Sequence, residues 1–364
     1  MRADRLIRKT YFRKLPAKGL PVVEVRNAAA GTQNAVFDLT LEQGGAEETG
    51  TRIGMAALLE QARFGAPEDE DRLSFRNEYD ALLWCARMMN ESPTARSLCH
   101  DIEEEGWTIG LADLKNEGFF IDNDEKLILL DHFALAPQAL SRSGFFRNVL
   151  LTTFIRALRD VWHEKRLGDY DRDYAPEQIL MVERIRAADC DTVTILCGWE
   201  LRAAGFTGIW RHLLGADEGD MAIVFTRFLE RDPGALFNGA ALAYAFRQWY
   251  ADTARVDGID HDTLEALDTI IDGADDVHPF GKNALLPRFV EELSTLPDGT
   301  CYLGGLGQGI LRDPFYAGLH DPINQTHLFQ MMYDMEVVMV NNVPFRDPSL
   351  ARMIFPLSEF VRIR

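Results

Sequence analysis

The sequence predicts a mostly helical α+β protein, and three observations indicate this class. Of the 364 residues, 47% are hydrophobic and 26% are charged, which is enough apolar material for one large domain or two smaller ones. Beyond residue 143, apolar residues recur at intervals of three and four over long stretches, as in amphipathic helices. Before that point, shorter apolar runs bounded by turn residues have the composition of β-strands.

Charge is distributed unevenly along the chain. The whole chain has 57 acidic and 38 basic residues and a net charge of −19. Residues Met1–Lys18, the basic leader, contain seven basic residues against Asp4 alone, a net charge of +6 that leaves −25 on the remainder. This negative remainder argues against binding to nucleic acid. The leader is expected to lie on the chain's own acidic surface or to contact an acidic partner, a phosphate or a lipid headgroup.

The sequence predicts a cytoplasmic protein without membrane insertion. No apolar core of a signal peptide follows the basic leader, and no run approaches the roughly 18 apolar residues of a membrane span. The cysteines include no CxxC pair, so a zinc finger is excluded and buried, reduced thiols are expected. They are Cys85, Cys99, Cys190, Cys197 and Cys301.

The predicted elements suggest four parts. These are the leader (1–18), a mixed β/α segment (19–92), a helical core (93–275) and a C-terminal region packed on that core (276–364). A hairpin is predicted from Gly118–Asp122 and Lys126–Leu130, on either side of a short polar turn. Strands are also predicted at Leu20–Val25 and Ala35–Leu41, and helices at Thr51–Phe64, Glu78–Met89, from Pro93 with Ser92 as its cap, Phe145–Arg166, Pro176–Ala204, Asp220–Glu230, Gly239–Ala251, Thr263–Ile271 with Asp262 as its cap, and Pro287–Leu293.

A polar stripe runs along the helix predicted at Phe145–Arg166. Apolar residues cover most of the circumference of this helix, which therefore is expected to be buried. The stripe lies between two apolar sides at three- and four-residue spacing, and it consists of Thr152, Arg156, Arg159, Asp160 and His163. Because buried polar groups need partners, we expect the stripe to face a cleft or other buried polar groups.

Several segments resemble a metallopeptidase-like family of unknown function with a small zincin-like core. The order of a hairpin, a long helix, a loop and a second long helix fits that family, and the resemblance covers roughly Thr94–Ala251. The segments that carry it are LLDHF (129–133), FIRALRDVWHE (154–164), RAADCD (186–191) and CGWELRAAG (197–205).

The resemblance implies a helix of the zinc-peptidase type. In zincins the first long helix carries HExxH, whose two histidines bind Zn²⁺ and whose glutamate polarises the attacking water. Placing that pattern on the polar stripe puts Arg156 and Asp160 at the histidine positions and Ala157 at the glutamate position. A third, acidic ligand is expected from the second helix near Ala187, with Asp189 and Asp191 beside it.

These departures predict a degenerate site without catalytic residues or a metal cofactor. A guanidinium has no free lone pair for a metal, and alanine cannot act as a base. The first interpretation is a metal site replaced by a salt bridge, in a protein that acts by binding a partner or ligand. The residues of that remnant site would be Arg156, Asp160, His163, Asp189 and Asp191.

Two other interpretations stay open. The Arg156–Asp160 pair could lie on a solvated helix face. The site could also have shifted, with Asp160, His163 and Glu164 as zinc ligands of a metal-dependent hydrolase. That arrangement would need at least one further ligand from the second helix, such as Glu183 or Asp191.

Overall fold

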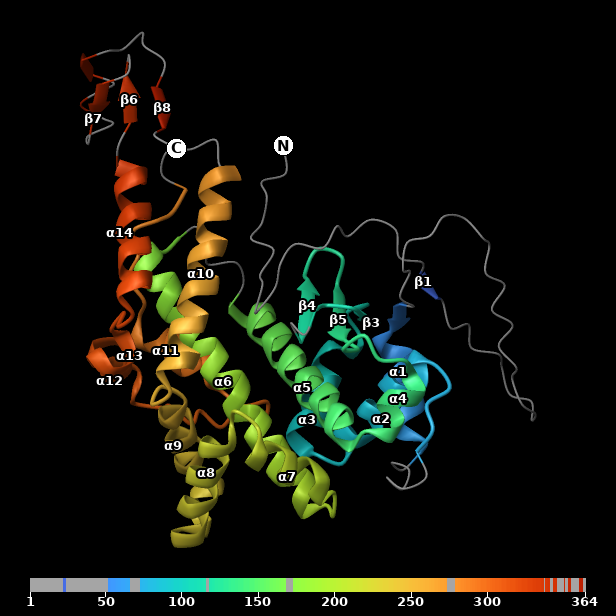
Figure 1. The fold of residues 1–364 in the computed structure, drawn as a ribbon. Coiled ribbons are helices and arrows are strands. Elements are labelled where there is room, and N and C mark those ends of the chain that lie inside the picture. Colours follow the sequence, from blue (N-terminus) through green and yellow to red (C-terminus); the bar gives the residue numbers. More distant parts are fainter. Residues whose placement is uncertain are drawn as a thin grey trace, which may run out of the picture. The chain divides into compact units, whose positions relative to one another are not determined.

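A computed structural model describes the greater part of the chain (Figure 1). The described residues are 22–23, 52–65, 73–115, 118–167, 173–273 and 279–336, followed by 338–340, 343–345, 350, 353–354 and 360–362. They form two compact units that divide between Ala157 and Leu158, inside one long helix. The basic leader and the strand predicted at Ala35–Leu41 lie outside the described residues.

The unit that ends at Ala157 is built around a mixed sheet with the strand order β1-β2-β3-β5-β4. The predicted hairpin is confirmed, because β4 and β5 pair antiparallel with Phe120 opposite Leu129. Strand β3 pairs parallel with β5 and antiparallel with β2. The elements are β1 (Val22–Val23), β2 (Arg52–Gly54), α1 (Met55–Arg63), α2 (Glu78–Asn90), α3 (Pro93–Glu103), β3 (Thr108–Ala112), β4 (Phe119–Asp122), β5 (Leu127–Asp131) and α4 (Pro137–Arg142).

Local sequence signals explain two of these elements. Ser92 caps α3, since its Oγ accepts a hydrogen bond from the amide of Ala95 at 3.1 Å, and Pro93 stands at the first helical position. Strand β5 is buried at every position, as expected for a continuous apolar run in the interior of a sheet.

The unit that starts at Leu158 is almost entirely helical. Helix α5 (Gly144–Leu167) crosses the boundary between the units. Its other elements are α6 (Pro176–Ala203), α7 (Thr207–Gly215), α8 (Gly219–Arg231), the 3-10 helix η2 (Pro233–Leu236), α9 (Ala240–Trp249), α10 (Thr253–Gly273), α11 (Pro287–Leu293), α12 (Gly307–Arg312), α13 (Pro314–Ala317), α14 (Pro322–Glu336) and an antiparallel sheet of β6 (Val338–Val340), β7 (Val343–Phe345) and β8 (Phe360–Arg362).

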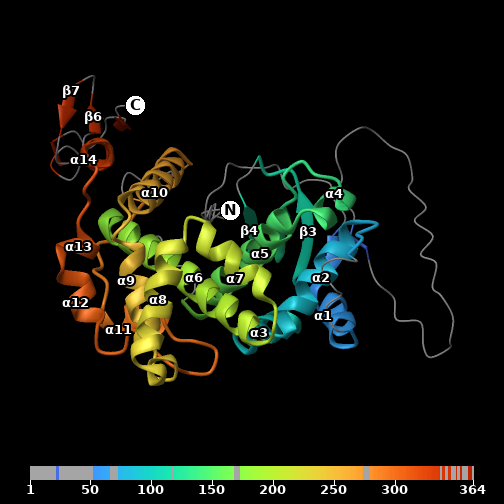
Figure 2. The ribbon, with the colours of Figure 1, turned by 60° about the horizontal axis from the view of Figure 1, so that its bottom comes forward.

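Helix α6 is the central element of this second unit. Helices α7, α8, α9, α10 and α11 all pack against it, and α8 lies beside α9 (Figure 2). Its side chains are buried around nearly the whole circumference, including those of Arg184, Arg186 and Asp189. A helix in such surroundings has to pair its own charges inside the unit.

Helix α10 is longer than the sequence predicted. It starts at Thr253, so Asp262 lies within the helix and the prediction that it caps a helix at Thr263 is wrong. The carboxylate of Asp252 accepts a hydrogen bond from the amide of Ala254 at 3.0 Å, at the true start. The extra turns are held by tertiary packing, because Val256, Ile259 and Asp260 are buried.

The predicted class is confirmed: the protein is a mostly helical α+β protein with a small mixed sheet. The two long helices were predicted at Phe145–Arg166 and Pro176–Ala204, and both are present to within about one residue. Among the residues that the structure describes, no helix has the length and apolar character required to cross a membrane.

Candidate functional site

Two side chains of α5 converge on one carboxylate of α6. Arg159 donates from Nε to Oδ2 of Asp189 at 2.6 Å and from Nη2 to Oδ1 at 3.1 Å. Nε2 of His163 lies 2.8 Å from Oδ2 of the same aspartate. Arg159 and His163 are four residues apart, so the helix directs both towards one point. All three side chains have an exposed fraction of 0%.

Other groups complete the surroundings of this ion pair. The hydroxyl of Tyr302 donates to Oδ1 of Asp189 at 2.6 Å. Nη2 of Arg159 also donates to the carbonyls of Leu293 and Thr295, at 3.0 and 3.1 Å. The guanidinium carbon lies 4.0 Å from the ring centroid of Trp162, on the same helix. We call Arg159, His163, Asp189 and Tyr302 the Asp189 cluster.

The protonation states in the Asp189 cluster follow from burial and charge. Burial alone would raise the pKa of Asp189, but the charge of Arg159 and the contacts with His163 lower it to about 2. Burial lowers the pKa of His163 to about 4, although Asp189 acts in the opposite direction. At neutral pH the cluster is therefore an Arg159–Asp189 ion pair with a neutral His163. Since the carboxylate only accepts, Nε2 of this histidine carries the proton.

A second group of charges lies beside the Asp189 cluster. Asp160 is buried and accepts a short hydrogen bond from Nη2 of Arg186 on α6. Nη1 of Arg186 lies 3.5 Å from Glu164 and 3.8 Å from Glu183. Three carboxylates thus surround one buried guanidinium, which satisfies the charge of Asp160 without a metal.

The structure places the residues predicted for the remnant site at several locations. His163 and Asp189 are in direct contact, and Asp160 lies one residue from Arg159 with Arg186 as its partner. The remaining predicted residues lie outside the Asp189 cluster. Arg156 is partly exposed on α5, and Asp191 accepts a hydrogen bond from Nε1 of Trp249 at 2.9 Å. Glu164 and Glu183 lie near Arg186, and Ala157 and Ala187 are buried and have no polar side-chain group.

Three residues of the site were not assigned to it from the sequence. Arg159 was noticed as part of the polar stripe, and its spacing from His163 was a usable signal. Arg186 lies in a segment used for the family resemblance, but nothing in the sequence pairs it with Asp160. Tyr302 is 113 residues from Asp189 in the chain, so no local pattern could identify it.

One group of described residues has donor atoms close enough to hold a metal ion. Ligand atoms of Asp160, His163 and Cys190 lie within 4.8 Å of one another, and all three residues are buried. Sγ of Cys190 is 4.0 Å from Nδ1 of His163, the ring nitrogen that faces away from Asp189. Burial, followed by the charge of Asp160, raises the pKa of the Cys190 thiol well above its ordinary value, which opposes formation of the thiolate ligand.

Comparison with known proteins gave a match to a family model for part of the chain. By its fold and site, the protein is a helical protein in which an Arg–Asp–His cluster is buried between two long helices, α5 and α6. Residues 143–303 match the model of the "Putative metallopeptidase family (DUF6782)", which confirms the resemblance inferred from the sequence. The matched segment contains every member of the Asp189 cluster. Neither the curated proteins nor the solved structures gave a match.

Proposed function

We propose that this protein is a non-catalytic relative of metallopeptidases that acts by binding a partner or ligand. The observation that carries the proposal is the bidentate pairing of Arg159 with Asp189 beside His163. In an HExxH helix, two histidines four residues apart face one metal. In the segment RDVWH (159–163), Arg159 stands at the first histidine position, Asp160 at the glutamate position and His163 at the second histidine position. This placement lies three residues beyond the one that starts at Arg156.

The residues of this placement do not fit a catalytic zinc ion. Such an ion needs three protein ligands and an open position for water. His163 and Asp189 are competent donors, but the guanidinium of Arg159 cannot ligate and its charge repels a dication. Both oxygens of Asp189 are already engaged by Arg159. We therefore assign the cluster a structural role, in which the cation of the ancestral site is an arginine side chain.

The closure of the cluster supports the same proposal. Arg159, His163 and Asp189 have no exposed surface, and Tyr302 is buried with them. A substrate bond could not reach these groups within hydrogen-bond distance. A binding role therefore has to use the outer surface of the protein.

A metal-dependent hydrolase is the second candidate, because one observation favours it. Donor atoms of Asp160, His163 and Cys190 lie within 4.8 Å of one another, and Glu164 is one turn beyond Asp160. Two contacts weigh against a metal at this place. Arg186 already neutralises Asp160, and burial keeps the Cys190 thiol protonated by raising its pKa.

Metal content distinguishes the two candidates. The full chain, produced in medium with added zinc and manganese and purified without chelators, is compared with Asp160→Ala by elemental analysis. The proposal predicts far less than one equivalent of metal in both proteins. One zinc or manganese ion per chain, lost on Asp160→Ala, would establish the hydrolase instead.

A further inference from the structure

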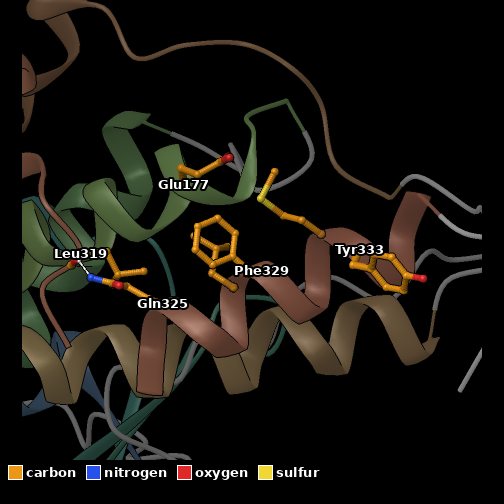
Figure 3. A pocket seen from close by; sticks show the side chains of 7 residues that line it. Glu177, Leu319, Gln325, Phe329 and Tyr333 are labelled. Atoms are coloured by element: carbon orange, nitrogen blue, oxygen red, sulfur yellow. Dashed lines mark hydrogen bonds between the residues drawn. The ribbon is translucent and has the colours of Figure 1, made fainter. Parts of the chain in front are cut away.

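A hollow of about 570 Å³ lies beside helix α14. Unlike the Asp189 cluster, it is open and is lined mostly by apolar side chains. Phe329 of α14 points into it, opposite Glu177 near the start of α6 (Figure 3). At one end, Nε2 of Gln325 donates to the carbonyl of Leu319 at 2.6 Å and fixes the wall there. The other lining residues are Leu328, Met332 and Tyr333.

The two faces of α14 have different surroundings. On one face, Leu328, Met331 and Met335 pack into a core cluster with residues of α6 and α10. On the other, the exposed fraction is 70% for Phe329, 74% for Ile323 and 42% for Tyr333. Three large apolar side chains exposed on one short helix mark an interaction surface.

The charge among the residues that line the hollow is negative and belongs to Glu177, and acidic residues prevail in the sequence of the helices that supply its walls and the core cluster. Helices α6, α10 and α14 meet at the core cluster beneath it. Over Pro176–Glu183, Asp257–Asp272 and Asp321–Asp334 the sequence contains no lysine or arginine. Acidic residues in these stretches that are at least partly exposed are Glu177, Glu183, Asp257, Asp262, Glu265, Asp268, Asp272, Asp321 and Asp334. The hollow therefore fits a cationic segment with apolar anchors.

We propose that the hollow binds the basic leader of the same chain. The leader is the most basic stretch of the sequence, with a net charge of +6 against −25 on the remainder. Its apolar residues Ile7, Tyr11 and Leu15 recur at intervals of four among the basic residues, a spacing typical of the apolar anchors of segments that bind in grooves. Bound in this way, the leader covers Phe329 and Tyr333 and keeps other cationic segments out of the hollow.

This inference is independent of the metal question, since the hollow shares no residue with the Asp189 cluster. The first test is limited proteolysis of the full chain with trypsin, which cleaves after the arginines and lysines of the leader. We expect cleavage within Met1–Lys18 to be at least about fivefold faster in Phe329→Ala/Tyr333→Ala and in Glu177→Lys than in the wild type. Phe237→Ala is the matched control, because Phe237 is 82% exposed on a different surface, beside η2.

An unchanged rate of leader cleavage in both Phe329→Ala/Tyr333→Ala and Glu177→Lys would overturn the proposal. An equally faster cleavage in Phe237→Ala would also overturn it. Thermal unfolding of each variant has to stay near that of the wild type, so that faster cleavage cannot come from global opening.

A second experiment reports on contact directly. A photo-crosslinking amino acid replaces Tyr11 in the full chain at low protein concentration, and crosslinked peptides are identified by mass spectrometry. We expect crosslinks to Pro322–Glu336 and to the start of α6, with a several-fold loss on Phe329→Ala. Crosslinks confined to other segments, or a yield that Phe329→Ala does not change, would contradict binding in this hollow.

Discussion

Two of the buried Arg–Asp pairs that helix α6 forms differ in the number of partners of the carboxylate. Asp189 of α6 pairs with Arg159, and Arg184 of α6 pairs with Asp260 of α10. Both arginines use two side-chain nitrogens on one carboxylate, and both also donate to two backbone carbonyls. The carboxylate of Asp189 has two further partners, His163 and Tyr302.

The Arg184–Asp260 pair shows which contacts are enough for an ion pair that holds two helices together. Arg184 ties α6 to α10, and its donation to the carbonyls of Tyr316 and Gly318 holds the segment before α14 in place. Nothing further is needed for that purpose. At Asp189, a histidine and a tyrosine surround the same type of pair, and both are residue types found at reactive sites. This excess is what we interpret as the trace of a metal site.

The largest effects are expected from breaking either pair. Arg159→Ala leaves Asp189 buried without its cation, and Arg184→Ala does the same to Asp260, so each should lower the free energy of unfolding by about 3–5 kcal/mol. Arg156→Ala is the control on α5, where a partly exposed side chain should cost about 1 kcal/mol or less. Urea denaturation measures all three. A cost of Arg159→Ala near that of Arg156→Ala would contradict the paired, buried state of Arg159.

Replacing both partners at once sharpens the comparison. Arg184→Met/Asp260→Leu removes both charges and should recover most of the stability lost in Arg184→Ala. Arg159→Met/Asp189→Leu should recover less, by on the order of 2–3 kcal/mol, because His163 and Tyr302 lose their acceptor and stay buried. Urea denaturation measures the free energy of unfolding of both double variants. Equal recovery of stability in the two would mean that the Arg159–Asp189 pair is a structural ion pair like Arg184–Asp260 and would contradict its interpretation as a former metal site.

The pH dependence of stability tests the neutral state of His163. Burial holds the pKa of His163 at about 4 in the folded chain, below its ordinary value of 6.5. The unfolded chain therefore takes up a proton first as the pH falls, and the folded chain loses stability between about pH 6.5 and 4. Between pH 7 and 5 this amounts to roughly 2 kcal/mol.

The matched variant isolates this contribution from other titrating groups. In His163→Gln the loss between pH 7 and 5 should be smaller than in the wild type by about that amount. Below pH 4, both proteins lose further stability because the pKa of Asp189 is about 2 in the folded chain, below its ordinary value of 3.8. Protonation of Asp189 in this pH range removes the ion pair with Arg159. Identical pH profiles of the two proteins above pH 5 would mean that burial does not lower the pKa of His163 in the folded chain.

The smallest effect is expected from Tyr302→Phe. This change removes one hydrogen bond to a charged acceptor and leaves the donors from Arg159 and His163 in place. The cost should be about 1.5 kcal/mol in thermal or urea unfolding. A cost as large as that of Arg159→Ala would indicate that Tyr302, rather than the ion pair, organises the cluster.

Much of the fold was predictable because its signals are local. The hairpin, the cap at Ser92 and the two long helices follow from turn residues and apolar periodicity. Helix α10 was shortened in the prediction because Gly258 and buried Asp260 interrupt its apolar pattern. Only the pairing with Arg184, which lies 76 residues away, explains why an aspartate is tolerated there.

The site was predictable only in part. The polar stripe was predicted and Asp189 was anticipated on the second helix, but the HExxH pattern was placed on Arg156, Ala157 and Asp160 and not on RDVWH (159–163). The partners of Arg159 at Leu293 and Thr295, more than 130 residues away, depend on tertiary packing. No spacing rule in a single sequence reaches that far, so Arg159 could not be distinguished from Arg156 as the buried cation.

The central claim is that Arg159 replaces a metal ion, and zinc titration of the variant Arg159→His tests it most directly. By isothermal titration calorimetry, Arg159→His should bind about one Zn²⁺ per chain, because it adds a donor one turn before His163 and frees Asp189. The wild type should not bind stoichiometrically, and Arg159→His/Asp189→Asn should lose the site. Stoichiometric binding by the wild type, or binding by Arg159→His that Asp189→Asn leaves unchanged, would contradict the replacement of a metal by Arg159.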